Sequence, residues 1–426
     1  MFWMHRSIKF RQARAIIVVL AATAISLNTA ASGLSLEDVE ELALTADPSV
    51  RSVEANRLAL EEMSVAAEQL PDPMLKTGVL ALPTDTFNLG QEAMTQVQLG
   101  LVQKFPRGHT RSLTSQQIRQ RSEGLDETVV DQKLRIVLDV REQYLETIKQ
   151  QHLLAINSEA ISVFSELADV TQDYYATGKV NQEDVFQAAV EVAKVEERAQ
   201  RILQEEESAR ARLATWIGEV AYQDLTPAWP PLETPSSDSV IQENLKSHPR
   251  ILALNKNIAA SETGVELARQ RYKPEFSIDV TYGGRGGTNP DGTSRSDLLS
   301  AMVVMDLPLF HKNRQDRVTA ASIAQSSAAM YTRDDIFRRM LREIDLHTST
   351  LHRQQERFSL FNTILVPEAA ASSMASFEAY QSSVGDLTTL LRAQITEFEL
   401  RLGQARLQAE ILKTQARLLY LQGELK

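Results

Sequence analysis

The chain has 426 residues, a formal net charge of −11 and no cysteine. Without thiols it has no disulfides, no thiolate metal site, no cysteine nucleophile and no lipid anchor on an N-terminal cysteine. Its acidic balance argues against nucleic acid as a partner, because surfaces that bind nucleic acids are usually basic.

Residues 1–31 have the pattern of a secretory signal peptide. Four cations between Arg6 and Arg14 precede a short apolar stretch over 15–27, and small residues follow at 29–32. A retained membrane anchor, the alternative, needs about 20 apolar residues, and this stretch is shorter. We therefore expect cleavage near residues 31–33. No later segment is long and apolar enough for a transmembrane helix, so we expect any membrane-embedded part to consist of strands.

The rest of the sequence is organised as two repeats. Pro48 and Pro73 recur about 200 residues later as Pro249 and Pro274. We assign the first repeat to 32–225, a linker rich in Pro, Ser and Thr to 226–239, and the second repeat to 240–426. Each repeat is expected to contain a helix, two strands, a long helix, a turn and a second long helix.

Long helices dominate both repeats. No proline lies between Pro106 and Pro227, and a single helix from about Arg111 to Thr177 would be ~100 Å long. Pro367 interrupts the corresponding helix of the second repeat and should kink or restart it. The last helix of each repeat has apolar residues in the alternating four-three spacing of a coiled coil, broken in the first repeat only by Glu206.

Each repeat also carries a pair of short strands, about 74–82 with 94–105 and about 274–283 with 298–307. Apolar and polar residues alternate in the third of these, where Glu275 and Asp279 lie on the polar face. Each strand is close to the ~9 to 11 residues that cross a bilayer when tilted. The fold class is therefore mainly α with a small β part.

Four strands are too few to close a membrane barrel, which needs about eight. Because an open sheet edge in lipid leaves amides unpaired, subunits must share their strands. Three copies give twelve strands with a lumen, and the polar face with Glu275 and Asp279 would line it. The alternative is a soluble α+β protein whose strand pairs pack on helices, but it explains neither the very long helices nor the signal peptide.

The chain resembles the TolC family of outer-membrane efflux factors over essentially its whole mature length. The resemblance rests on the duplicated layout, on Pro71-Asp72-Pro73-Met74-Leu75, on Met94-Thr95-Gln96 and Gln103-Lys104-Phe105-Pro106, and on the turns at 175–180 and 380–385. It implies a homotrimer with a 12-stranded barrel in outer-membrane lipid and a helical barrel in the periplasm. It also implies a periplasmic adaptor (membrane fusion protein) and an inner-membrane pump of the resistance-nodulation-division type. The first motifs are most similar to the heavy-metal branch, with drug or organic-solute export as the alternative.

The resemblance places the two helical turns, about 176–181 and 382–386, at the tip that meets the adaptor. The expected contact residues are Gly178, Val180, Val384, Gly385 and Leu387, although the glycines also suit turns as such. Tyr380 matches a tyrosine that closes the pore in many family members. Their basic residue and two aspartates correspond here to Gly385, Thr389 and Arg392, which puts an acidic ring from the second repeat in doubt. The first repeat could supply the gate instead, through Tyr175, Glu183 and Asp184.

Three further readings remain at this point. The exit duct of type I protein secretion shares the architecture, and a periplasmic coiled-coil adaptor or scaffold would have one helical hairpin rather than two. An enzyme has least support, because no pattern of catalytic residues occurs. We expect no cofactor and no bound metal, since His347 and His352 are five residues apart and do not share one helix face.

Overall fold

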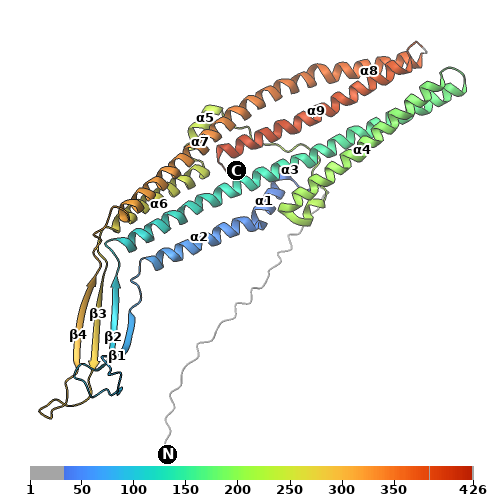
Figure 1. Cartoon of the computed structure of the whole chain (residues 1–426). Coiled ribbons are helices and arrows are strands. Elements are labelled where there is room, and N and C mark those ends of the chain that lie inside the picture. The colour runs from blue at the N-terminus through green and yellow to red at the C-terminus, as the bar shows by residue number, and fades with distance from the viewer. Residues whose placement is uncertain (1–32, 383, 425–426) are drawn as a thin grey trace, which may run out of the picture.

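The computed structural model describes residues 33–382 and 384–424 of the chain. The expected signal peptide lies outside the described residues. The protein is elongated, with a small sheet at one end and two helical hairpins that reach the other end (Figure 1). It is mainly helical with a small antiparallel sheet, so the predicted fold class is confirmed.

The same order of elements occurs twice, as the repeat predicts. Each half runs through helices, two strands, a long helical segment, a turn and a final long helix (Figure 1). The first half comprises α1 Leu36–Ala46, α2 Pro48–Ala67, β1 Met74–Leu80, β2 Gln96–Phe105, α3 Thr110–Ala176 and α4 Gln182–Ile217. The second comprises α5 Asp238–Asn244, α6 Pro249–Gln270, β3 Phe276–Gly284, β4 Leu298–Met305, α7 Gln315–Leu360, α8 Val366–Gln381 and α9 Leu387–Gln422.

The two long ascending segments differ in continuity. Helix α3 has 67 residues without a break, which corresponds to ~100 Å. Its counterpart consists of α7, a π-helical segment at Phe361–Leu365 and α8. Pro367 lies in the first turn of α8, where a missing N–H is tolerated. The sequence predicts that Pro367 kinks or restarts this helix, and the structure places a π-helical interruption of the α-helix just before it.

The coiled-coil spacing matches the buried positions of α4 and α9. In α9, Leu391, Phe398 and Leu402 are at most 3% exposed. In α4, Glu206 interrupts the apolar series, and its carboxylate forms an ion pair with Arg210 one turn later, at 2.5 Å. The hydrophobic contacts of the described residues form several separate clusters along the molecule rather than one central core. No helix in residues 33–382 or 384–424 is both long and apolar enough to cross a membrane.

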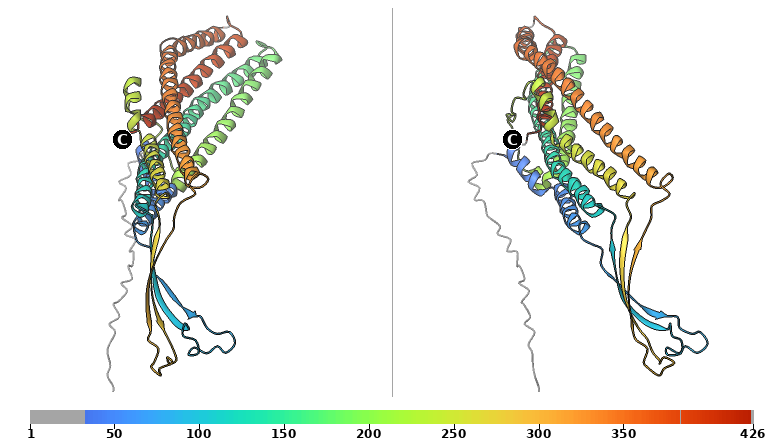
Figure 2. Two further views of the ribbon diagram at one scale, coloured as in Figure 1. Left: turned by 60° about the vertical axis from the view of Figure 1, so that its left-hand side comes forward. Right: turned by 90° about the vertical axis from the view of Figure 1, so that its left-hand side faces the viewer.

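Helices α3 and α9 are joined by ion pairs between the two repeats. Lys413 of α9 contacts Glu146 of α3 at 2.5 Å, and Arg417 contacts Glu142 at 2.6 Å. Burial alone raises the pKa of Glu146, but hydrogen bonds from Lys149 and Lys413 outweigh it and lower the pKa to about 2. The two hairpins consequently run side by side in all views (Figures 1 and 2).

Candidate functional site: the sheet and the helical tips

The four strands form one antiparallel sheet in the order β1-β2-β3-β4. The central pair joins the two repeats, because β2 belongs to the first and β3 to the second. Its register places Phe105 opposite Phe276 and Val97 opposite Gly284. The outer strands β1 and β4 are exposed along their whole length and have a neighbour on one side only. Strand β1 ends at Leu80, two residues before the expected end, because Ala81 adopts a φ of 54°.

One face of the sheet is apolar and exposed. On β3, Ile278, Val280 and Tyr282 are 37%, 44% and 50% exposed. The register aligns them with residues of the same face on the other strands. This apolar face consists of Leu75, Thr77 and Val79 on β1, Val97, Leu99 and Leu101 on β2, Phe276 to Tyr282 in alternation on β3, and Leu299, Ala301, Val303 and Met305 on β4. A water-soluble sheet would bury such a face against helices.

The opposite face carries the polar side chains of β2 and β3 and is more tightly packed there, whereas β4 adds the apolar Met302 and Val304. Asp279 lies here, and its carboxylate accepts a hydrogen bond from Lys76 at 2.9 Å and another from Thr281 at 2.5 Å. Lys76 belongs to β1 and Asp279 to β3, so the ion pair crosses β2. It does so near Gly100, where a Cβ would lie 2.4 Å from the Thr281 hydroxyl. Thr281 is 5% exposed although no helix covers it, because its polar neighbours surround it.

Charged residues join the ends of the strands at the base of the sheet. Arg107, which follows β2, forms ion pairs with Glu275 at 3.7 Å and with Asp306. The Asp306 carboxylate also accepts a hydrogen bond from the backbone N–H of Glu275 at 2.5 Å. Glu275, predicted as a lumen residue, is thus engaged at the sheet base, while Asp279 lies higher on the polar face.

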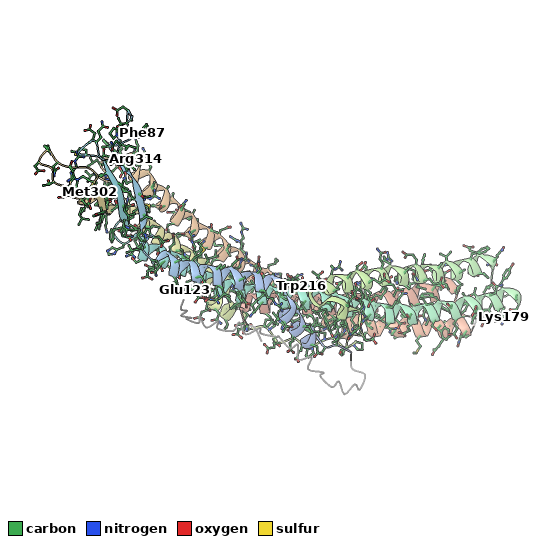
Figure 3. The ribbon with its side chains drawn as sticks, turned by 90° about the horizontal axis from the view of Figure 1, so that it is seen from below. Phe87, Glu123, Lys179, Trp216, Met302 and Arg314 are labelled. Carbon is green, nitrogen blue, oxygen red and sulfur yellow. The ribbon has the colours of Figure 1, made fainter. Side chains whose placement is uncertain are left out.

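The first helical turn lies at the end of the molecule farthest from the sheet. Figure 3 shows Lys179 of this turn at one end and Met302 of β4 at the other. Gly178 adopts a φ of 72°, which favours glycine, and the N–H of Lys179 donates to the carbonyl of Tyr174 at 2.9 Å. Val180 is half-buried in the same turn.

The three gate candidates of the first repeat have different surroundings. Tyr175 is 43% exposed at the end of α3, and Glu183 is exposed at the start of α4. The Asp184 carboxylate instead accepts a hydrogen bond from the N–H of Asn181 at 3.1 Å, as part of a capping box. Asp184 therefore has a structural role whether or not it also faces the pore.

The second turn is built differently. Val384 is 84% exposed, whereas Leu387 is 3% exposed and belongs to the core cluster between the hairpins. The N–H of Gly385 donates to the carbonyl of Ala379 at 2.9 Å, and the Asp386 carboxylate caps α9 by accepting the N–H of Thr389 at 2.8 Å. Val384 is thus the free apolar side chain of this turn.

Tyr380 lies inside the helical pack rather than on the surface of the protomer. Its ring is 5.8 Å from that of Tyr174, and 5% of the residue is exposed. Its hydroxyl is buried without a geometric hydrogen-bond partner, and burial raises its pKa. A cavity of about 690 Å³ lies beside it, between α3 and α8. The structure therefore does not bring Tyr380 together with Tyr175 and Glu183 on one open surface.

Two residues of this site were not predicted from the sequence. Lys76 and Arg107 form the ion pairs of the sheet, yet their partners are about 200 residues away in the chain. No local pattern could have suggested them, because the strand register decides which carboxylate each one meets. Within the described residues, no cluster of metal-ligating side chains occurs.

Comparison with known proteins supports the same architecture. No family model matches the sequence. The chain is 20% identical to the cobalt-zinc-cadmium resistance protein CzcC of Cupriavidus metallidurans over 381 residues. This alignment covers 88% of this chain and 86% of CzcC. A membrane protein from Pseudomonas aeruginosa is similar in structure, with a TM-score of 0.80 and 16% identity over 91% of this chain and 90% of that one. The open-state MtrE outer-membrane channel of Neisseria gonorrhoeae has a TM-score of 0.76 and 13% identity, over 91% of this chain and 88% of that one.

The chain therefore shares its fold, two long helical hairpins joined to a small sheet, with proteins that include an outer-membrane channel. More particularly, the chain has the TolC-type fold, and the resemblance to the TolC family drawn from the sequence is confirmed. The similar proteins are named as a resistance protein, a membrane protein and a channel. They agree with the expectation that the chain is not an enzyme.

Proposed function

We propose that the protein is the outer-membrane exit duct of a tripartite efflux system. The observation that carries this proposal is the sheet, with its exposed apolar face and its two open edges. In a bilayer, unpaired edge amides cost several kcal/mol each. The edges are satisfied when copies of the chain complete one barrel, and the apolar face then contacts lipid.

A homotrimer is the assembly that best fits the sheet. Two copies would give eight strands, and a barrel of that size is filled by its own side chains. Three copies give twelve strands and leave a lumen lined by the polar face, including Asp279 and Lys76. The helices would then extend into the periplasm as a tunnel, with the helical turns at its far end.

The tip is the proposed site of contact with a periplasmic adaptor and, through it or directly, an inner-membrane pump. Gly178, Val180, Val384 and Gly385 lie in the two turns, and the exposed Val384 is the clearest contact candidate among them. Leu387 supports the turn from inside rather than by contact. For the pore gate we propose Tyr175, Glu183, Asp184 and Tyr380, with the exposed Glu183 as the cleanest position to test.

Divalent metal cations are the proposed cargo. This assignment rests on the likeness to CzcC, whose name refers to cobalt, zinc and cadmium. Deletion of the gene should sensitise the cell to these cations more than to hydrophobic drugs, and the cloned gene should restore resistance. Sensitisation to drugs without sensitisation to the metal cations would assign the duct to organic solutes. Loss of a secreted protein would assign it to type I secretion.

The channel itself is tested with purified mature protein. It should migrate as an oligomer before heating and as a monomer afterwards, and it should produce single-channel currents in planar bilayers. A monomeric product without current would contradict the proposal and favour a soluble adaptor or scaffold. The two helical hairpins and four strands of each protomer already count against an adaptor with one hairpin.

A further inference from the structure

The internal repeat indicates how the edge strands of two copies of the chain would pair. The β2–β3 pair is a seam between the first and the second repeat within one chain. The open edges are β4, the last strand of the second repeat, and β1, the first strand of the first repeat. A pairing of β4 with β1 of another copy would therefore be the repeat-related counterpart of the seam already present.

The seam within the chain has a defined register relative to the prolines at its base. Phe105, one residue before Pro106, lies opposite Phe276, two residues after Pro274. The two rings stack with centroids 5.0 Å apart. The counterparts of these prolines are Pro308 and Pro73. One residue before Pro308 is Leu307, and two residues after Pro73 is Leu75.

From this relation we propose that β4 of one protomer pairs antiparallel with β1 of the next, with Leu307 opposite Leu75. The same register places Met305 opposite Thr77 and Val303 opposite Val79. The inference rests on the proposed oligomeric channel and adds the arrangement of its subunit seam. All six residues belong to, or continue, the apolar face defined above, so the register keeps that face continuous. A shift by one residue would place Met305 opposite Lys76. Because side chains alternate between the two faces of a strand, this register would put β4 side chains of the apolar face next to β1 side chains of the opposite face.

The exposed residues at the base of the sheet fit this seam. Leu307 and Leu75 are 66% and 67% exposed in the isolated protomer. Arg107 and Glu275, which form an ion pair in the seam within the chain, correspond to Leu309 and Met74 in the seam between chains. These two are also exposed, at 70% and 45%. The charged contact inside the protomer is thus replaced by an apolar contact between protomers. This contact would explain why Leu309 and Met74 are exposed in the isolated protomer.

Engineered disulfides can test the register without background, because the natural chain has no cysteine. The first variant combines Thr77→Cys with Met305→Cys, the predicted pair. Two matched controls combine Thr77→Cys with Val303→Cys or with Leu307→Cys, which correspond to shifts of two residues in either direction. All four positions lie on the same face, so the three variants differ only in register.

Each variant is purified as the oligomer, oxidised with a membrane-permeant copper catalyst and separated by non-reducing denaturing electrophoresis. Directly opposite residues lie within bridging distance, whereas diagonal neighbours are about 7–8 Å apart. The predicted pair should therefore cross-link about ten-fold faster than either control. Val79→Cys with Val303→Cys tests the same register independently and should behave like the predicted pair.

The outcomes separate this inference from the channel proposal. Preferential cross-linking of either control, or no cross-linking of either predicted pair in oligomers that conduct, overturns the register and leaves the channel in place. Absence of oligomers and of current in the cysteine-free protein contradicts the channel itself. A double variant that does not assemble is replaced by the second predicted pair, whose cross-linking then decides.

Discussion

The ammonium group of Lys76 lies 2.9 Å from the carboxylate of Asp279, on strands that are separated by β2. The two side chains neutralise each other on the polar face, so the proposed lumen carries no net charge at this level. Opposite charges on an exposed face contribute little to stability, because solvent screens them. The main effect of Lys76 and Asp279 should be on which ions pass through the proposed lumen.

Removing one member of this pair should change ion selectivity. Asp279→Asn leaves a positive charge in the lumen and should increase the permeability to anions, whereas Lys76→Met should increase the permeability to cations. The double variant should return toward the natural protein. Reversal potentials across a salt gradient measure the effect, and unchanged potentials in both single variants would show that the pair lies outside the conducting path.

Gly100 should be intolerant of a side chain. A Cβ at this position would lie 2.4 Å from the Thr281 hydroxyl and 3.0 Å from the carbonyl of Val280. Gly100→Val should destabilise the protein by about 1–3 kcal/mol through overpacking. Gly78→Val is the matched control on β1, because no atom lies within 4 Å of its Cβ position. The thermal unfolding temperature of the dissociated protomer should fall for Gly100→Val and stay near that of the natural protein for Gly78→Val.

Acid should weaken the contact between α3 and α9 through Glu146. Since its folded pKa of about 2 is below the ordinary value of 4.5, its contribution is present above about pH 4.5 and is lost as the pH falls toward 2. Glu146→Gln should lower the free energy of unfolding by about 1–3 kcal/mol at neutral pH and by less at pH 2. Thermal unfolding followed by circular dichroism measures this difference. Glu410→Gln, at an exposed position of α9, should show no such pH-dependent loss.

A second pH effect should come from His248, which is 1% exposed at the start of α6. Its Nδ1 accepts the N–H of Arg250 at 3.2 Å, so Nε2 carries the proton and donates to the carbonyl of Tyr420 at 3.1 Å. Burial lowers the pKa of His248, while the hydrogen bond to Tyr420 partly opposes the shift. The neutral ring therefore stabilises the fold above about pH 6.5, and this contribution is lost as the pH falls.

His248→Asn keeps a capping side chain but cannot titrate. The natural protein should lose thermal stability relative to this variant as the pH falls from about 7.5 to about 5, because its buried ring must then take up a proton. Parallel loss of thermal stability in both proteins over this range would contradict the role assigned to His248.

Periodicity made the helices and strands predictable, but not the contacts between distant segments. The four-three spacing of α9 and the alternation around Ile278 reflect burial of one face, which a sequence displays directly. The pairing of Lys76 with Asp279 depends on two strand registers, and no local pattern encodes those. The inward position of Tyr380 depends in the same way on the rotation of α8 against α3, which motif matching did not resolve.

The open edge of β4 also has a consequence before assembly is complete. Its eight residues, Leu298–Met305, include no charge and no proline, and all are exposed. Such an edge is a template for unspecific strand addition. In the proposed trimer, closure consumes three molecules, whereas wrong pairing needs only two, so dilution slows correct assembly more steeply than wrong pairing. At low concentration of the chain, the exposed β4 edge therefore favours wrong pairing over correct assembly.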